Sequence, residues 1–341
     1  MSQRIAIVFP GQGSQTVGMG ADIYQASPAA RLVFDMADDA LGFSLSSLCF
    51  DGPESALRET VNTQPAIVAT SLALLAALQE AAGAAGDDND VLAGPIHPVF
   101  VAGHSVGEYS AVAASGALGV ADTLRLVRER GRLMHDEGLR CPSGMAAVLG
   151  LDSETLATIC AEATDKALAS TSSDEAARHP GAGRVVVAND NAPGQIVISG
   201  ATTALEVAME LARARGAKRV VPLAVSGAFH SPVMAPAAAS LAAAVAASPV
   251  RDPVVPVIAN ITAEPIKTES QLREELAQQI VSPVQWTRTV EYAAQHGVDI
   301  FVEVGAGQVL AGLIKRIAKG ATVVSVGSSA DVALVAERLR A

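Results

Sequence analysis

The fold of this 341-residue chain is decided by residues 99–111, VFVAGHSVGEYSA. The first four, Val99–Ala102, are apolar and predict a short buried strand. Glycines flank Ser105 in the pattern G-x-S-x-G, and a helix is predicted over Val106–Ser115. The glycines allow a sharp strand-to-helix turn that exposes a serine hydroxyl at a helix N-terminus. The strand-turn-helix context favours a nucleophilic serine, whereas the pattern alone also fits a structural turn.

Strands and helices alternate on both sides of this stretch. Short apolar strands are predicted at Arg4–Phe9, Val254–Ala259 and Asp299–Val304. The predicted helices are an Ala-rich run after Ser226 and residues 28–40, 64–82, 106–115, 121–137, 271–280, 284–295 and 308–319. We expect the helix at 64–82 to begin at Gln64-Pro65, since proline is tolerated in a first turn. This alternation predicts an α/β, hydrolase-like core with a mostly parallel sheet.

The middle of the chain has a different order of predicted strands and helices. Predicted strands lie at 144–149, 184–188, 195–199 and 218–223, and predicted helices at 152–163 and 202–215. This β-α-β-β-α-β order is that of a ferredoxin-like unit. We therefore expect a large α/β subdomain (1–140 and 224–341) with a small subdomain (141–223) inserted, and a ligand cleft between them. Residues 83–98 and 164–183 are predicted to be loop expansions.

Composition excludes several classes of protein. Half of the residues are hydrophobic and 17% are charged, the reverse of a disordered chain. The net charge of −11 argues against non-specific nucleic-acid binding. The apolar run Ala66–Leu78 is too short to span a membrane, and Val233–Ser248 is interrupted by Pro236. The three cysteines show no CxxC spacing and the N-terminal apolar run is too short for a signal peptide, so we expect a cytoplasmic protein without membrane contact.

A serine nucleophile requires a base, and His230 is the best candidate. It lies in Ser226–Pro232, where small residues follow a predicted strand. The other histidines lie in loops, near helix ends or directly beside the serine (His97, His104, His135, His179 and His296). The alternative for His230 is that it caps the helix beginning at Pro232.

The loop after the first strand, Pro10–Gln15, is glycine-rich but lacks a nucleotide-binding pattern. Thr16 stands where a dinucleotide fingerprint requires glycine, and the chain has neither a Gly-Lys nor a His-Glu dipeptide. We therefore predict no P-loop and no HExxH metal site. A turn at the end of a strand can instead donate a backbone N–H to an oxyanion hole, with the N–H of Val106 as the second donor.

Five motifs in order resemble one enzyme family. They are Phe9–Gln15, Gly103–Ala111, Asn189–Gln195, Ala228–Ser231 and Ser282–Trp286. Together they resemble the FabD-type malonyl-CoA:acyl carrier protein transacylases of fatty acid synthesis and the related acyltransferase domains of polyketide synthases. The resemblance covers the chain from Ile5 to about Ile317.

The resemblance implies roles for individual residues. Ser105 would be the nucleophile that becomes malonylated and His230 its base. The backbone N–H groups of Gln12 and Val106 would form the oxyanion hole. A backbone carbonyl near Ser282–Trp286, that of Gln285, would orient the imidazole without an aspartate.

Other positions would bind the acyl group. Arg130 would hold the malonyl carboxylate, which a guanidinium matches bidentately. Gln64, Asn189 and Gln285 would line the pocket, and the bulk of Phe229 would accompany malonyl rather than branched acyl groups. Without the resemblance, Arg130 would be taken for part of a solvated helix face.

The resemblance also implies the reaction and the partners. Malonyl would pass from coenzyme A to Ser105 and then to the phosphopantetheine thiol of acyl carrier protein, without metal or bound cofactor, in a monomer. Because that carrier is acidic, docking requires local basic clusters. Two candidates are Arg213, Arg215, Lys218 and Arg219, and Lys315, Arg316 and Lys319. A serine hydrolase with a carboxylate behind His230 and a non-catalytic acyl-binding protein are the competing interpretations.

Overall fold

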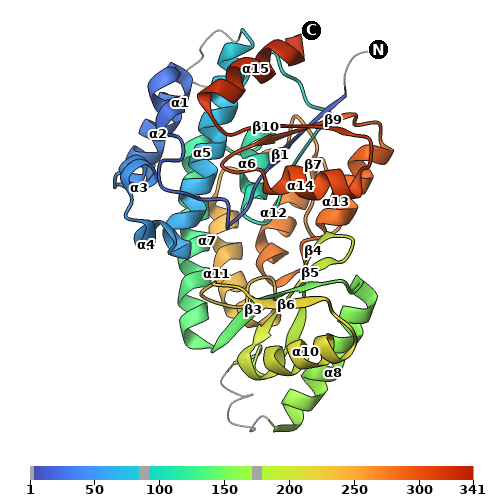
Figure 1. Cartoon of the computed structure of the whole chain (residues 1–341). Coiled ribbons are helices and arrows are strands. Elements are labelled where there is room, and N and C mark those ends of the chain that lie inside the picture. The colour runs from blue at the N-terminus through green and yellow to red at the C-terminus, as the bar shows by residue number, and fades with distance from the viewer. Residues whose placement is uncertain (1–3, 84–91, 171–178, 341) are drawn as a thin grey trace.

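A six-stranded, mostly parallel sheet forms the centre of the larger part of the molecule (Figure 1). The computed structural model describes residues 4–83, 92–170 and 179–340. In spatial order the strands are β10 (Thr322–Val326), β9 (Ile300–Val304), β1 (Ile5–Phe9), β2 (Phe100–Gly103), β7 (Val257–Ile258) and β8 (Pro265–Ile266). Neighbouring strands run parallel except β7 and β8, which confirms the predicted α/β class.

Helices cover both faces of this sheet. They are α1 (Ala21–Ala26), α2 (Pro28–Leu41), α3 (Leu45–Asp51), α4 (Glu54–Leu57), α5 (Thr60–Ala81), α6 (Gly107–Ala114), α7 (Val120–Arg140), α11 (Ala235–Ala247), α12 (Glu269–Gln278), α13 (Trp286–Gln295), α14 (Val309–Ile317) and α15 (Ser329–Arg340), with 3₁₀ turns η1 (Pro232–Met234) and η2 (Gln279–Val281). Side chains of β1 alternate between the faces. Ile7 and Phe9 join the core that contains α5, whereas Val8 packs in the cluster with Trp286 of α13.

Helix α5 begins at Thr60, so the prediction that it starts at Gln64 was wrong. Pro65 lies inside the helix, where its missing N–H leaves the carbonyl of Val61 without its usual donor. The Nη1 of Arg128 donates to that carbonyl at 2.7 Å, which explains how the helix continues through the proline. The helix is long and apolar enough to cross a membrane, but 89% of its apolar window is buried inside the protein. It is the core helix that the sequence suggested.

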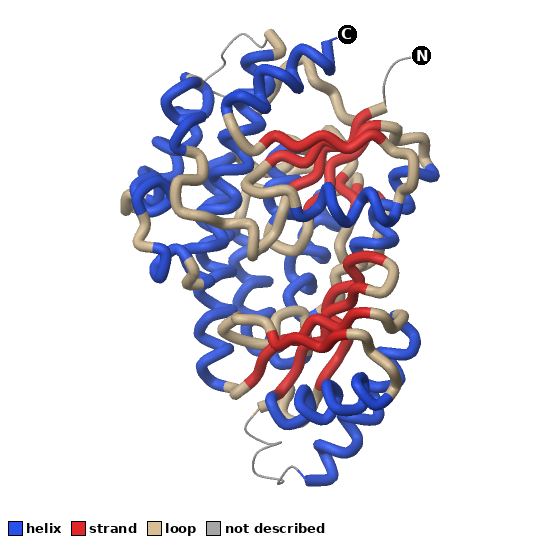
Figure 2. Tube along the Cα trace, in the orientation of Figure 1, coloured by secondary structure: helices blue, strands red, loops and turns tan. Residues whose placement is uncertain are grey.

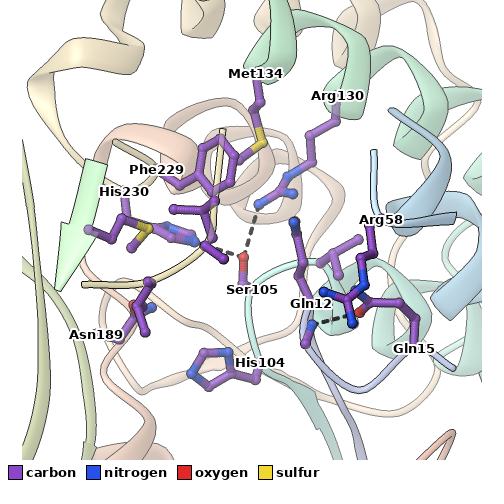
Figure 3. Close-up of a pocket in the computed structure, with 16 residues that line it drawn as sticks. Gln12, Gln15, Arg58, His104, Ser105, Arg130, Met134, Asn189, Phe229 and His230 are labelled. Carbon is purple, nitrogen blue, oxygen red and sulfur yellow. Dashed lines mark hydrogen bonds between the residues drawn. The ribbon is translucent and has the colours of Figure 1, made fainter. Parts of the chain in front are cut away.

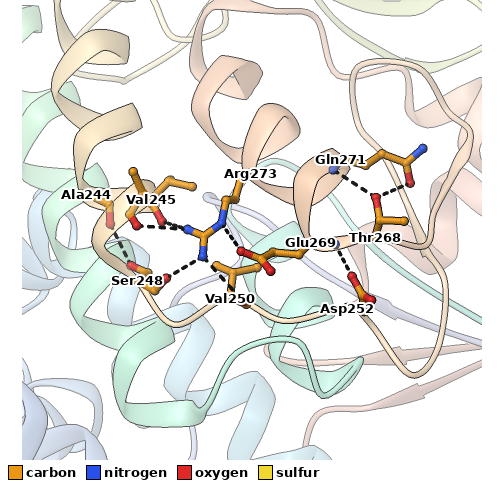
Figure 4. A network of polar contacts seen from close by, with 10 residues as sticks. Ala244, Val245, Ser248, Val250, Asp252, Thr268, Glu269, Gln271 and Arg273 are labelled. Carbon is orange, nitrogen blue, oxygen red and sulfur yellow. Dashed lines mark hydrogen bonds and ion pairs between the residues drawn. The ribbon is translucent and has the colours of Figure 1, made fainter.

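An arginine ties α11 to α12 (Figure 4). The guanidinium of Arg273 donates to carbonyls at the end of α11, including that of Val245, and to the carbonyl of Ser248 at 3.1 Å. Its Nε pairs with Glu269 one turn earlier, at 2.7 Å. The arginine thus satisfies carbonyls that a helix end leaves without partners.

A second, four-stranded antiparallel sheet lies below the first in Figure 2. Its order is β4 (Val185–Ala192), β5 (Gln195–Ala201), β3 (Ser143–Leu149) and β6 (Arg219–Pro222). Helices α8 (Ser153–Ser170) and α10 (Thr202–Ala214) pack on it around their own core cluster. The expected loop 164–183 is helical as far as Ser170. Its remainder at 171–178, like 84–91 of the other expected loop, lies outside the described residues.

The two parts are joined at the end of β4. The N–H of Asp190 donates to the carbonyl of Val284 at 2.9 Å, and the N–H of Val284 donates to the carbonyl of Ala188 at 2.8 Å. This connection places Asn189 of the smaller sheet beside the carboxyl ends of β1 and β2 in the larger one, where the pocket described next lies.

Candidate active site

The turn between β2 and α6 holds Ser105 in a strained conformation. Its φ is 52°, in the left-handed region that non-glycine residues rarely adopt. A Cβ at Gly103 would lie 2.0 Å from the backbone of Gly107, and one at Gly107 would lie 2.3 Å from the carbonyl oxygen of Phe9. Both flanking glycines are therefore required by close packing. This geometry supports the predicted strand-turn-helix context of the serine.

Ser105 and His230 are in direct contact. The Ser105 Oγ lies 2.7 Å from the Nε2 of His230, whose ring is buried. On its other side, Nδ1 lies 2.9 Å from the carbonyl oxygen of Gln279 and 3.1 Å from that of Ser282. An Nδ1–H donated to these carbonyls leaves the Nε2 lone pair facing the serine hydroxyl. Nothing in the part of the chain that the structure describes places a carboxylate on the imidazole.

The carbonyls that orient His230 belong to Gln279, the first residue of η2, and to Ser282, the residue after it, and not to Gln285, so that expectation was wrong. The backbone N–H of Gln285 donates to the carbonyl of Asn260 at 2.8 Å, and its side chain donates to the carbonyl of Ile261 at 2.6 Å. Gln285 therefore secures the loop after β7. Ser282 caps η2 and lies directly before the Pro-Val-Gln-Trp segment, so the two carbonyls come from the turn that precedes this motif.

The surroundings of His230 keep it neutral. Burial, together with the nearby positive charge of Arg130, lowers the pKa of the imidazole to about 3. Near neutral pH the ring can accept a proton from Ser105 and return it later.

Arg130 is buried in α7 and points at the serine. Its Nη1 donates to Gln64 Oε1 at 2.7 Å, and its Nη2 to Gln279 Oε1 at 2.8 Å. Nη2 also lies 3.2 Å from the Ser105 Oγ, and the guanidinium carbon is 5.4 Å from the centroid of the Tyr109 ring. The interpretation as a solvated helix face is wrong for this residue, which is 1% exposed.

No carboxylate neutralises Arg130 within 4 Å in the described ranges, although Arg125 and Arg132 of the same helix form ion pairs. Its Nε also has no acceptor there. Burial lowers the pKa of the guanidinium, because moving a charged group out of water costs free energy. A buried cation 3.2 Å from the nucleophile is suited to an anionic substrate group.

The serine, the histidine and the arginine open into one pocket of about 390 Å³ (Figure 3). Its lining residues are Gln12, Gly13, Gln15, Arg58, His104, Ser105, Val106, Arg130, Met134, Met145, Asn189, Leu223, Ala224, Val225, Phe229 and His230. The structure thus brings together seven of the nine predicted site residues. Gln64 lies behind Arg130 as its hydrogen-bond acceptor, and Gln285 does not line the pocket.

Several residues of the site escaped prediction. His104 lines the pocket, and its Nε2 lies 2.7 Å from Asn191 Oδ1. Glu108, Asn260 and Gln279 form a buried polar layer beneath the serine. Glu108 lies within residues 99–111, but a glutamate in the first turn of a helix is common, so the sequence gives no sign of its buried contacts. In the ranges that the structure covers, no group of three or more His, Cys, Asp or Glu side chains could hold a metal.

Comparisons with known proteins agree with this geometry. The family model of the acyl transferase domain matches residues 6–336. A Bacillus subtilis (strain 168) protein named malonyl CoA-acyl carrier protein transacylase is 39% identical over 337 residues, which cover 99% of this chain and 98% of the relative. The solved structure of the malonyl CoA-acyl carrier protein transacylase from Coxiella burnetii is 33% identical, with a TM-score of 0.88 over 100% of this chain and 99% of that one. A malonyl-transacylase solved in complex with a type II PKS acyl-carrier protein is 36% identical, with a TM-score of 0.87 over 98% of this chain and 100% of that one.

Proposed function

The chain belongs to the acyl transferase family, and we propose that it transfers the malonyl group of malonyl-CoA to the phosphopantetheine thiol of an acyl carrier protein. Such transfer would supply extender units for fatty acid synthesis. One observation supports malonyl above other acyl groups: the buried guanidinium of Arg130, without a carboxylate partner in the described chain, lies 3.2 Å from the Ser105 hydroxyl. Malonyl carries a free carboxylate in addition to its thioester, so it can supply the missing anion. A neutral acyl group would leave the buried charge unpaired.

The reaction proceeds in two half-reactions on Ser105. His230 Nε2 accepts the hydroxyl proton as Oγ attacks the thioester carbonyl. The tetrahedral intermediate collapses with cleavage of the C–S bond, and the coenzyme A thiolate takes the proton from His230. The phosphopantetheine thiol then gives its proton to His230 and attacks the malonyl ester, and Ser105 Oγ recovers the proton as it leaves.

We assign the oxyanion hole to the backbone N–H groups of Gln12 and Val106. Both residues line the pocket with Ser105, Gln12 from the loop after β1 and Val106 as the residue that caps the N-terminus of α6. The strands that precede them are parallel neighbours, with Phe9 opposite Gly103, so the two loops lie at the same edge of the sheet. Each such donor contributes roughly 10²–10³ in rate.

The carrier protein is proposed to dock on the exposed basic residues near the β4–β5 turn. Arg316 donates to the carbonyl of Pro193 at 3.0 Å, and the neighbouring Gly194 accepts from the N–H of Gly150 at 2.9 Å. A Cβ on Gly150 would touch the side chain of Lys218. Lys218 of one basic cluster and Arg316 of the other therefore lie near the same turn, and we propose that they belong to one docking surface. An acidic partner would be steered there despite the net charge of −11.

Four further statements stay predictions. The order β4-β5-β3-β6 and the packing of α8 and α10 support a ferredoxin-like subdomain at 141–223. We also expect a monomer without metal or bound cofactor, acting in the cytoplasm.

A serine hydrolase remains the competing function, with water as the acceptor. The expected carboxylate behind His230 is replaced by two backbone carbonyls, which favours the transferase. Intact-mass measurement after incubation with malonyl-CoA tests the proposal. We expect a stable malonyl adduct on the wild-type chain and none on Ser105→Ala. Release of free malonate without an adduct would favour the hydrolase, and neither product would favour a binding protein.

A further inference from the structure

A fully buried carboxylate, Glu108, lies in the first turn of α6, three residues after the nucleophile. Its two oxygens accept hydrogen bonds from two amide side chains. Oε1 accepts from the backbone N–H of Asn260 at 2.8 Å and from its Nδ2 at 3.1 Å. Oε2 accepts from the Nε2 of Gln279. Because a carboxylate offers only acceptors to these groups, it fixes which end of each amide faces away from it.

The orientation of the Asn260 amide determines its hydrogen bonds to the turn that holds the nucleophile. With Nδ2 turned toward Glu108, Oδ1 accepts the backbone N–H of Ser105 at 2.8 Å. The same Nδ2 donates to the carbonyl of Gly103 at 2.7 Å. One amide therefore secures both sides of the strained turn at Ser105.

The Gln279 amide carries the orientation to the arginine. Its Nε2 donates to Glu108 and to the carbonyl of Ser105 at 2.9 Å, so Oε1 is left to accept from Arg130 Nη2 at 2.8 Å. If the amide were reversed, an NH₂ group would face the guanidinium and an oxygen would face the carboxylate. Both contacts would be repulsive.

We propose that Glu108 is a positioning residue that orients Asn260 and Gln279 and thereby holds the nucleophile turn and the acyl-binding arginine in register. It touches neither substrate nor the reacting atoms. The inference rests on the proposed malonyl transfer and adds to it the group that aligns the carboxylate site with the serine. Selectivity for a carboxylated acyl chain then depends on a residue that lies outside the pocket.

A second carboxyl group is compatible with this role. Glu275 forms a hydrogen bond with Glu108 and accepts from the N–H of Ile261 at 3.0 Å. Burial raises the pKa of both carboxyl groups, and the charge of Glu275 raises the pKa of Glu108 further. A proton on Glu108 that is donated to Glu275 leaves the remaining lone pairs of the Glu108 oxygens to accept from the amides, so Glu108 still offers only acceptors to Asn260 and Gln279.

Glu108→Gln tests the proposal because it preserves size and removes the acceptor-only character. One end of the new amide can still accept from Asn260, but its NH₂ group must face the NH₂ group of Gln279. We expect kcat/KM for malonyl-CoA to fall by about 10- to 100-fold, the range for a lost hydrogen bond to a charged group. Acetyl-CoA, which makes no use of Arg130, should lose less, so the malonyl-to-acetyl ratio should fall at least fivefold.

Gln279→Leu removes the amide that links Glu108 to Arg130 and leaves the backbone carbonyl that contacts His230. We expect the same fall in the malonyl-to-acetyl ratio. The ratio of the double variant should be no lower than that of the more strongly affected single variant. This variant also keeps the test decisive if Glu108→Gln fails to fold.

Glu303→Gln is the matched control. Glu303 is equally buried and accepts the N–H groups of Leu310 and Ala311 at 2.9 and 2.8 Å, at the start of α14. Its substitution should lower the melting temperature and leave the malonyl-to-acetyl ratio unchanged. If the variants at Glu108 and Gln279 behave like this control, or lose both acyl groups equally, the positioning role is wrong. A wild-type chain that forms no malonyl adduct would instead overturn the proposed function itself.

Discussion

Replacing Arg130 by alanine should convert a malonyl-selective enzyme into one that prefers neutral acyl groups. The substitution removes the one buried guanidinium that lines the pocket and leaves the acceptors of Gln64 and Gln279 without their donor. Water can enter the space, since Arg130 borders a pocket of about 390 Å³. The serine–histidine contact should persist, because the imidazole is oriented by the carbonyls of Gln279 and Ser282 rather than by Arg130.

The magnitude follows from the hydrogen bonds that the malonyl carboxylate would lose. Two charge-assisted bonds of about 1.5–3 kcal/mol each give about 3–6 kcal/mol of differential binding. At about 1.4 kcal/mol per factor of ten, kcat/KM for malonyl-CoA should fall by roughly 10²–10⁴. Acetyl-CoA has no carboxylate to lose, so its kcat/KM should be retained or improved.

The assay compares kcat/KM for malonyl-CoA and acetyl-CoA with the same carrier protein, and thermal unfolding reports whether the variant is folded. Arg132→Ala is the matched control, because Arg132 lies on the same helix but is exposed and paired with Glu129 and Asp136. It should leave the ratio of the two substrates unchanged. Equal losses for malonyl and acetyl in Arg130→Ala would refute the assignment of this residue to the carboxylate.

Three more predictions concern pH, stability and docking. Burial lowers the pKa of His230 from 6.5 to about 3, so its contribution to stability is present above pH 6.5 and is lost as the pH falls toward 3. Denaturant titrations should show that the wild type loses stability relative to His230→Asn between these pH values. Parallel pH profiles for the two proteins would contradict the burial argument. Arg273→Ala should lower the free energy of unfolding by about 1–3 kcal/mol through loss of its bonds to the carbonyls that end α11, with unchanged activity; unchanged stability would show that these bonds contribute nothing. Arg219→Glu with Lys315→Glu should slow carrier association most strongly at low salt and leave malonylation of the serine intact; identical transfer kinetics across ionic strength would place the docking surface elsewhere.

Sequence alone predicted the parts of the fold whose signals are local. The apolar run of β1 predicted that strand, and the glycines around Ser105 predicted the turn and the helix that follows it. The family resemblance gave residue roles, and seven of nine predicted positions line one pocket. Helix starts were less predictable, as at Pro65, because Arg128 is distant in sequence and supplies the donor that lets α5 extend past the proline.

The missed residues depend on contacts between distant segments. The orientation of His230 by Gln279 and Ser282 depends on where η2 ends, which no residue pattern at Gln285 reveals. Glu108 and Asn260 are 152 residues apart and meet only because β2 and β7 are neighbours in the sheet. Such buried polar layers have no periodicity, so only the assembled sheet shows them.

The most direct test of the central claim is a single-turnover transfer from the isolated malonyl adduct. The wild-type chain is malonylated with malonyl-CoA, freed of excess substrate and mixed with holo acyl carrier protein or with buffer alone. Transfer through Ser105 predicts that the malonyl mass moves from this chain to the carrier within the mixing experiment and stays on the chain in buffer. Release of malonate at the same rate with and without carrier would contradict the account.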